Sequence, residues 1–128
     1  MSFLQRLARV GLPVFYVLMT VIGIRLVWND APTVETVAQG FTVAGQALFA
    51  LLAMAAFVAR ILRPRIAFRF AVGWAVALTL TAAAAPVTFG DGGAEAAIAG
   101  AFIGGVVAAG ALWVHHRSDQ EPPGDLAP

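Results

Sequence analysis

Arg25 is the residue whose type agrees least with its neighbours, because it lies inside an otherwise apolar run from Val10 to Trp28. A guanidinium at the centre of a membrane-spanning helix costs about 2.5–3.5 kcal/mol, and the cost falls toward the helix ends. We therefore expect a partner for Arg25, either an acid or lipid headgroup, or an anion or substrate in an outward-facing pocket. The residues predicted to form this intramembrane polar site are Arg25, Gln46, Asp30, Asp91 and Glu95.

Gln46 is the strongly polar residue of a second apolar run. A buried amide needs hydrogen-bond partners. Gln46 can form a hydrogen bond between helices, which is a purely structural role, or it can contact a ligand. We expect the structural role. Thr79 and Thr81 lie in a third apolar run and need no ligand, because a threonine hydroxyl bonds a carbonyl of its own helix.

His115, His116 and Asp119 superficially suggest a metal site. Adjacent helical residues point about 100° apart and cannot readily chelate one ion, so we expect an interfacial location. The sequence has no cysteine, and its serines, Ser2 and Ser118, have no catalytic context. We predict no metal, no cofactor, no catalytic residue and no enzymatic activity.

The elements that position these residues are predicted to be membrane-spanning helices. Hydrophobic residues make up 60% of the chain and charged residues 12%, far from the composition of a soluble domain. A bilayer core needs roughly 20 apolar residues per helix, and four runs satisfy this. We predict an all-α bundle of four transmembrane helices over residues 1–117, at about 10–28, 33–62, 66–89 and 94–115. A polar, proline-rich tail over 118–128 is expected to be disordered.

Several boundaries follow from local signals. Arg6 and Arg9 before the first run suggest a signal peptide, but the run ends without a small-x-small cleavage site, so we expect the helix to be retained. Asp30 or Thr33 is the expected N-cap of the second helix. Pro86 is expected to bend or end the third.

The arginines predict the orientation, since cytoplasmic loops are enriched in basic residues. Seven arginines fall on one side of a four-span arrangement and Arg25 toward the other. Both termini are therefore predicted to be cytoplasmic. The chain has no lysine and is rich in alanine and glycine, which indicates a GC-rich bacterial genome, and hence a bacterial inner membrane. The seven arginines are Arg6, Arg9, Arg60, Arg63, Arg65, Arg69 and Arg117.

The fourth run carries two ridges of small residues, a feature of close helix packing in lipid. One ridge contains Gly100 and Gly104, and the other contains Gly105. Ala75 and Thr79 lie on a matching ridge of the third run. We expect these ridges to pack the two helices within one chain, and the alternative is a homodimer or partner interface.

Two functions remain open. The first, which we favour, is a non-catalytic accessory or assembly subunit of an inner-membrane complex, because mid-membrane acids that could relay protons are absent from the sequence. The second is a small oligomeric transporter or channel with its polar site near Arg25 and Gln46. The expected partners are membrane lipids and a membrane protein or second copy. A net charge of +1 gives no reason to expect nucleic acid.

Overall fold

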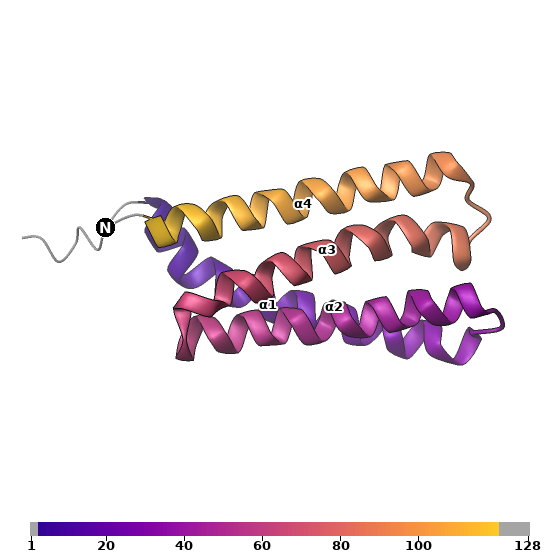
Figure 1. Cartoon of the computed structure of the whole chain (residues 1–128), viewed down its shortest axis with the longest axis horizontal. Helices are drawn as coiled ribbons and strands as arrows, with labels where there is room; N and C mark the ends of the chain where they lie inside the picture. The colour runs from indigo at the N-terminus through magenta and orange to yellow at the C-terminus, as the bar shows by residue number, and fades with distance from the viewer. Residues whose placement is uncertain (1–2, 121–128) are drawn as a thin grey trace, which may run out of the picture.

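A computed structural model describes residues 3–120. Four long helices follow one another up and down (Figure 1). All four are long and apolar enough to cross a membrane. The prediction of an all-α, multi-pass membrane protein built as a four-helix bundle is confirmed. The elements are α1 (Phe3–Asp30), the short 3-10 helix η1 (Ala31–Thr33), α2 (Val37–Leu62), α3 (Pro64–Thr88) and α4 (Ala94–Gln120).

The bundle has two ends, which we name by their charges. The arginine end holds the start of α1, the α2–α3 turn with Arg63 and Arg65, and the end of α4 (Figure 1). The acidic end holds the α1–α2 connection with Glu35 and the α3–α4 connection with Asp91. Apart from Arg25 and Asp119, the basic and acidic residues of the described chain therefore lie at opposite ends of the long axis.

The second helix begins later than predicted. Thr36 is its N-cap: the Thr36 side chain accepts a hydrogen bond from the Gln39 backbone N–H at 3.1 Å, and Gln39 Oε1 accepts from the Thr36 N–H at 3.2 Å. This reciprocal pair outcompetes the expected caps, and Thr33 instead donates to the Asp30 carbonyl at 2.8 Å. The expectation of Asp30 or Thr33 as cap of this helix was wrong, although Thr-x-x-Gln is a capping-box pattern visible in the sequence.

Pro86 does not end α3, which continues to Thr88. A proline removes only its own N–H, so other carbonyls of the helix still accept hydrogen bonds. The Phe89 N–H, for example, donates to the Ala85 carbonyl at 2.9 Å. The carbonyl that loses its intrahelical donor is that of Ala82, four residues earlier.

The fourth helix runs beyond its predicted end at residue 115. Ser118 and Asp119, predicted to belong to a disordered tail, are helical. The Ser118 hydroxyl donates to the His115 carbonyl at 2.8 Å, and Asp119 lies 3.7 Å from Arg60 of α2. These contacts stabilise the last turns. The rest of the predicted tail, residues 121–128, lies outside the described residues.

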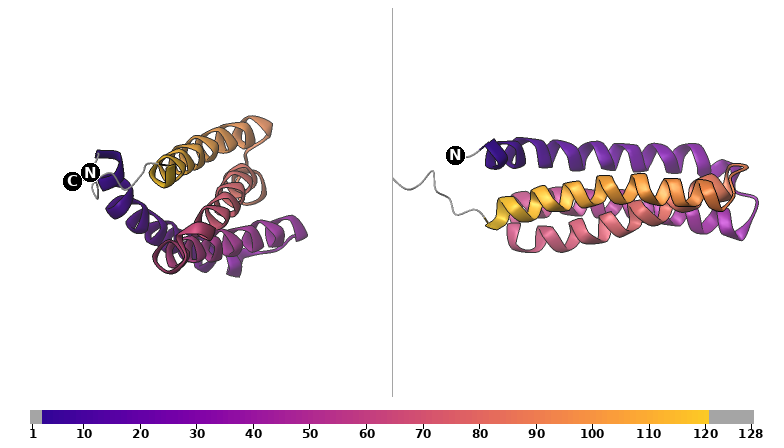
Figure 2. Two further views of the ribbon diagram at one scale, coloured as in Figure 1. Left: turned by 60° about the vertical axis from the view of Figure 1, so that its left-hand side comes forward. Right: turned by 90° about the horizontal axis from the view of Figure 1, so that it is seen from above.

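The four helices do not close evenly into a bundle. Both α2 and α4 pack extensively on α3, and α1 packs on α2, whereas α1 contacts α4 much less (Figure 2). Gly23 of α1 permits the close approach to α2, because a Cβ at this position would lie 2.7 Å from the Phe49 ring. The α1–α4 side of the bundle is consequently its open side.

An aromatic cluster fills the middle of the bundle. The Trp74 ring of α3 is fully buried and meets Phe15 and Tyr16 of α1 edge-on, with ring centroids 5.4 Å and 5.8 Å apart. Phe49 of α2 completes the cluster at 6.1 Å. The two edge-to-face pairs of Trp74 with Phe15 and Tyr16 are favourable beyond the area they bury. Through this cluster α1 contacts α3 as well as α2.

Candidate functional site

The small-residue seam between α3 and α4 contains two of the predicted glycines. A Cβ at Gly104 would lie 2.9 Å from the Ala82 Cβ and 3.4 Å from the Thr79 Cα, and a Cβ at Gly100 would collide with the Ala82 carbonyl oxygen. Ala75 is buried within the bundle. Gly105 lies away from this seam, since a Cβ placed there meets no described atom within 4 Å apart from the neighbouring backbone of α4 itself.

Two of the five residues predicted for the polar site come together. Gln46, 1% exposed, donates through Nε2 to Asp30 Oδ2 at 2.9 Å, and so links α2 to the end of α1. Arg25, Asp91 and Glu95 are exposed. Within residues 3–120, no ion pair or hydrogen bond joins Arg25 to any acid. Asp30, one of the acids predicted for this site, therefore pairs with the amide of Gln46.

A crevice of about 320 Å³ lies beside this pair, toward the acidic end. All four helices line it, with Ile22 and Leu26 from α1 and Ile103 from α4 among its apolar walls. Gln46 and Asp30 are the strongest polar groups in the lining. The Oε1 atom of Gln46 is buried and has no hydrogen-bond partner among the described residues.

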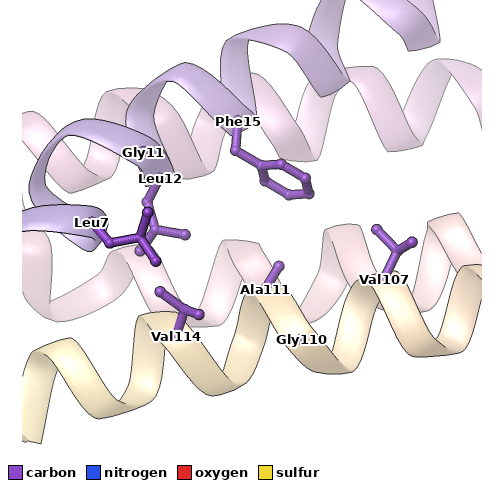
Figure 3. A pocket seen from close by; sticks show the side chains of 8 residues that line it. All are labelled: Leu7, Gly11, Leu12, Phe15, Val107, Gly110, Ala111 and Val114. Atoms are coloured by element: carbon purple, nitrogen blue, oxygen red, sulfur yellow. The ribbon is translucent and has the colours of Figure 1, made fainter. Parts of the chain in front are cut away.

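A second hollow of about 220 Å³ continues along the same open side toward the arginine end (Figure 3). Its lining side chains come from α1 and α4 and are all apolar. Phe15 and Val107 lie on opposite sides of the space, as do Leu7 and Val114 (Figure 3). Val107 also lines the crevice beside Gln46, so the two hollows adjoin. We call the two together the α1–α4 groove.

Polar side chains gather at the arginine end, inside the bundle. The Tyr16 hydroxyl and His115 Nδ1 lie 2.8 Å apart, and both side chains are fully buried. His115 Nε2 lies 3.6 Å from Asp119 Oδ2, too far for a hydrogen bond. Arg60 contacts Asp119 and donates to the Ser118 hydroxyl at 3.4 Å. The cluster ties α1, α2 and α4 together where they converge.

His115 faces the interior of the bundle, whereas its neighbour His116 is exposed, and the interfacial depth expected for both stays a prediction. One signal could have placed it: His115 follows Gly104, Ala108 and Ala111 at spacings of four, three and four residues, which is the small face that packs on α3. Tyr16 carried no comparable signal, because its partner is 99 residues away.

Among residues 3–120, no group of three His, Cys, Asp or Glu side chains is placed to hold a metal ion.

The Tyr16–His115 pair is fully buried, whereas Gln46 and Asp30 lie in the lining of the groove, at one end of an apolar space. Thr79 and Thr81 donate to the carbonyls of Ala75 and Ala77 at 2.9 Å and 2.7 Å, as predicted for residues that need no ligand.

Neither protein-family models, nor curated proteins, nor solved structures match this chain.

Proposed function

We propose that this protein is a non-catalytic accessory or assembly subunit of a bacterial inner-membrane complex. The observation that carries the proposal is that α4 has two small-residue faces and uses one of them within the chain. Gly100 and Gly104 pack on α3, whereas the space around Gly105 is open. Its neighbour one turn later, Ala109, is exposed.

Helices in lipid associate through close van der Waals approach, since lipid tails are as apolar as leucine and provide no hydrophobic force. Small residues allow that approach. The fold itself sets no limit on side-chain size at Gly105, because a Cβ there meets no described atom within 4 Å. A partner's transmembrane helix would find at Gly105 and Ala109 the surface that α3 finds at Gly100 and Gly104.

Affinity purification in a mild detergent, followed by mass spectrometry, tests the proposal. The test variant is Gly105→Leu, and its matched control is Gly110→Leu, a second α4 glycine with no described atom within 4 Å of an added Cβ. We expect a stoichiometric membrane-protein partner with the wild type and with Gly110→Leu, and its loss with Gly105→Leu. Self-association alone, or a partner that tolerates Gly105→Leu, would contradict the proposal.

The alternative, a small oligomeric transporter or channel, has one observation in its favour, the Gln46–Asp30 pair in the crevice. The adjoining hollow is lined by apolar residues only, so the polar contacts do not continue toward the arginine end. Solute flux in liposomes that is abolished by Arg25→Ala, with normal expression and folding, would favour the transporter over the accessory subunit.

A further inference from the structure

We propose that the α1–α4 groove binds an amphiphile with a primary ammonium head, the head at Gln46 and Asp30 and an alkyl chain along the apolar part of the groove. This site lies on the side of α4 that carries Val107 and Gly110 and is independent of the partner surface at Gly105. Binding requires neither transport nor a partner protein.

The first step concerns the orientation of the Gln46 amide. A carboxylate accepts hydrogen bonds and has no proton to donate, so the nitrogen of the amide must face Asp30. The 2.9 Å contact between Nε2 and Oδ2 has this geometry. Oε1 is therefore left as a buried acceptor without a described partner, in a residue that lines the crevice. An unsatisfied buried carbonyl of this kind costs about 1–3 kcal/mol, and a ligand donor would remove that cost.

The second step concerns charge. Asp30 brings a carboxylate to the crevice, and within residues 3–120 no basic side chain forms an ion pair with it. A primary ammonium has three donors and a positive charge, so it can bond both Oε1 and the carboxylate. Hydrogen bonds between ionised groups are roughly twice as strong as neutral ones. A hydroxyl has one donor and no charge, and can satisfy only one of the two acceptors.

The third step concerns the chain of the ligand. Val107 lines both hollows, so an alkyl chain with its head in the crevice of about 320 Å³ can extend past Val107 into the hollow of about 220 Å³. Leu12, Phe15 and Val114 provide apolar walls there. Gly110 lies on the floor of this hollow and has open space above it. A larger side chain at Gly110 would fill the space proposed for the alkyl chain of the ligand.

Photolabelling in phosphatidylcholine nanodiscs tests the proposal on the full-length protein. The probes are dodecylamine and dodecanol, each with a diazirine near the end of its chain, and the labelled residues are located by mass spectrometry. Asp30→Asn removes the negative charge and keeps an oxygen to accept from Gln46. Gly110→Leu fills the hollow, and Gly105→Leu is its control on the other face of α4. Thermal unfolding in detergent shows whether each variant is folded.

We expect the amine to label α1 and α4 residues of the groove and unlabelled dodecylamine to compete. Asp30→Asn should weaken amine binding about tenfold, the size of one charge-assisted hydrogen bond, and should leave the alcohol unchanged. Gly110→Leu should reduce labelling, and Gly105→Leu should not. Nanodiscs containing phosphatidylethanolamine identify the source: competition by this lipid assigns the ammonium to a lipid headgroup, and its absence assigns it to a free long-chain amine. Equal labelling by amine and alcohol, or labelling unaffected by Gly110→Leu in a folded protein, would overturn the proposal.

Discussion

The buried pair of Tyr16 and His115 shows how much a single polar contact contributes at the residue scale. Their hydrogen bond, at 2.8 Å, joins α1 to α4. Apolar side chains of the same two helices face each other around a hollow. A hydrogen bond between two fully buried groups fixes both side chains, because neither can turn to water. The pair therefore helps to hold α1 against α4.

Tyr16→Phe should destabilise the protein by about 1–3 kcal/mol, because it leaves His115 Nδ1 buried without a partner. The free energy of unfolding in mixed micelles of mild and denaturing detergent measures the loss. A double-mutant cycle with His115→Leu isolates the contact. In the His115→Leu background, Tyr16→Phe should cost much less. An equal cost in both backgrounds would show that the hydroxyl stabilises the bundle through another group.

Among the elements, α3 and α4 are fitted to each other by a proline on one helix and a glycine on the other. Pro86 lacks the N–H that would bond the Ala82 carbonyl. Gly100 of α4 lies directly against that carbonyl oxygen, where a Cβ would collide with it. A Cα–H group in such a contact is a weak donor. The seam thus gives the carbonyl freed by Pro86 a close neighbour, and the absence of a side chain at Gly100 makes the approach sterically feasible.

Gly100→Ala should therefore destabilise the bundle, by about 1–3 kcal/mol for an overpacked contact. Gly105→Ala is the matched control on the same helix, because an added Cβ has no described atom within 4 Å. It should change stability by no more than about 0.5 kcal/mol, apart from the higher helix propensity of alanine. Thermal unfolding of both variants in detergent measures the difference. Similar losses in the two variants would mean that helix flexibility, and not the seam, determines the effect.

At the scale of the whole molecule, length and hydrophobicity were sufficient to predict the four spans, because a bilayer requires about 20 apolar residues per helix. They could not predict the open α1–α4 side. Faces toward lipid and faces toward other helices are both apolar, so the hydrophobic pattern does not reveal which side packs. The sequence accordingly predicted that Gln46 needs a hydrogen-bond partner, but it did not identify Asp30 as that partner. The Thr36 cap is a different case, because its Thr-x-x-Gln capping-box pattern is visible in the sequence and was sufficient to predict the start of α2.

The orientation of the bundle in the membrane is a prediction of the same scale, and the absence of cysteine from the sequence makes it directly testable. The arginine end should face the cytoplasm, because arginine-rich connections are retained there. Single cysteines at Ser2 and Gly93 report the two ends. Gly93 suits the outer position because an added Cβ meets no described atom within 4 Å, whereas at Gly92 it would lie 2.9 Å from the Pro86 carbonyl oxygen. In intact cells, a membrane-impermeant maleimide should label Gly93→Cys and spare Ser2→Cys until the membrane is permeabilised. Labelling of Ser2→Cys from outside would reverse the orientation, and with it the side from which the groove's Gln46–Asp30 end is reached.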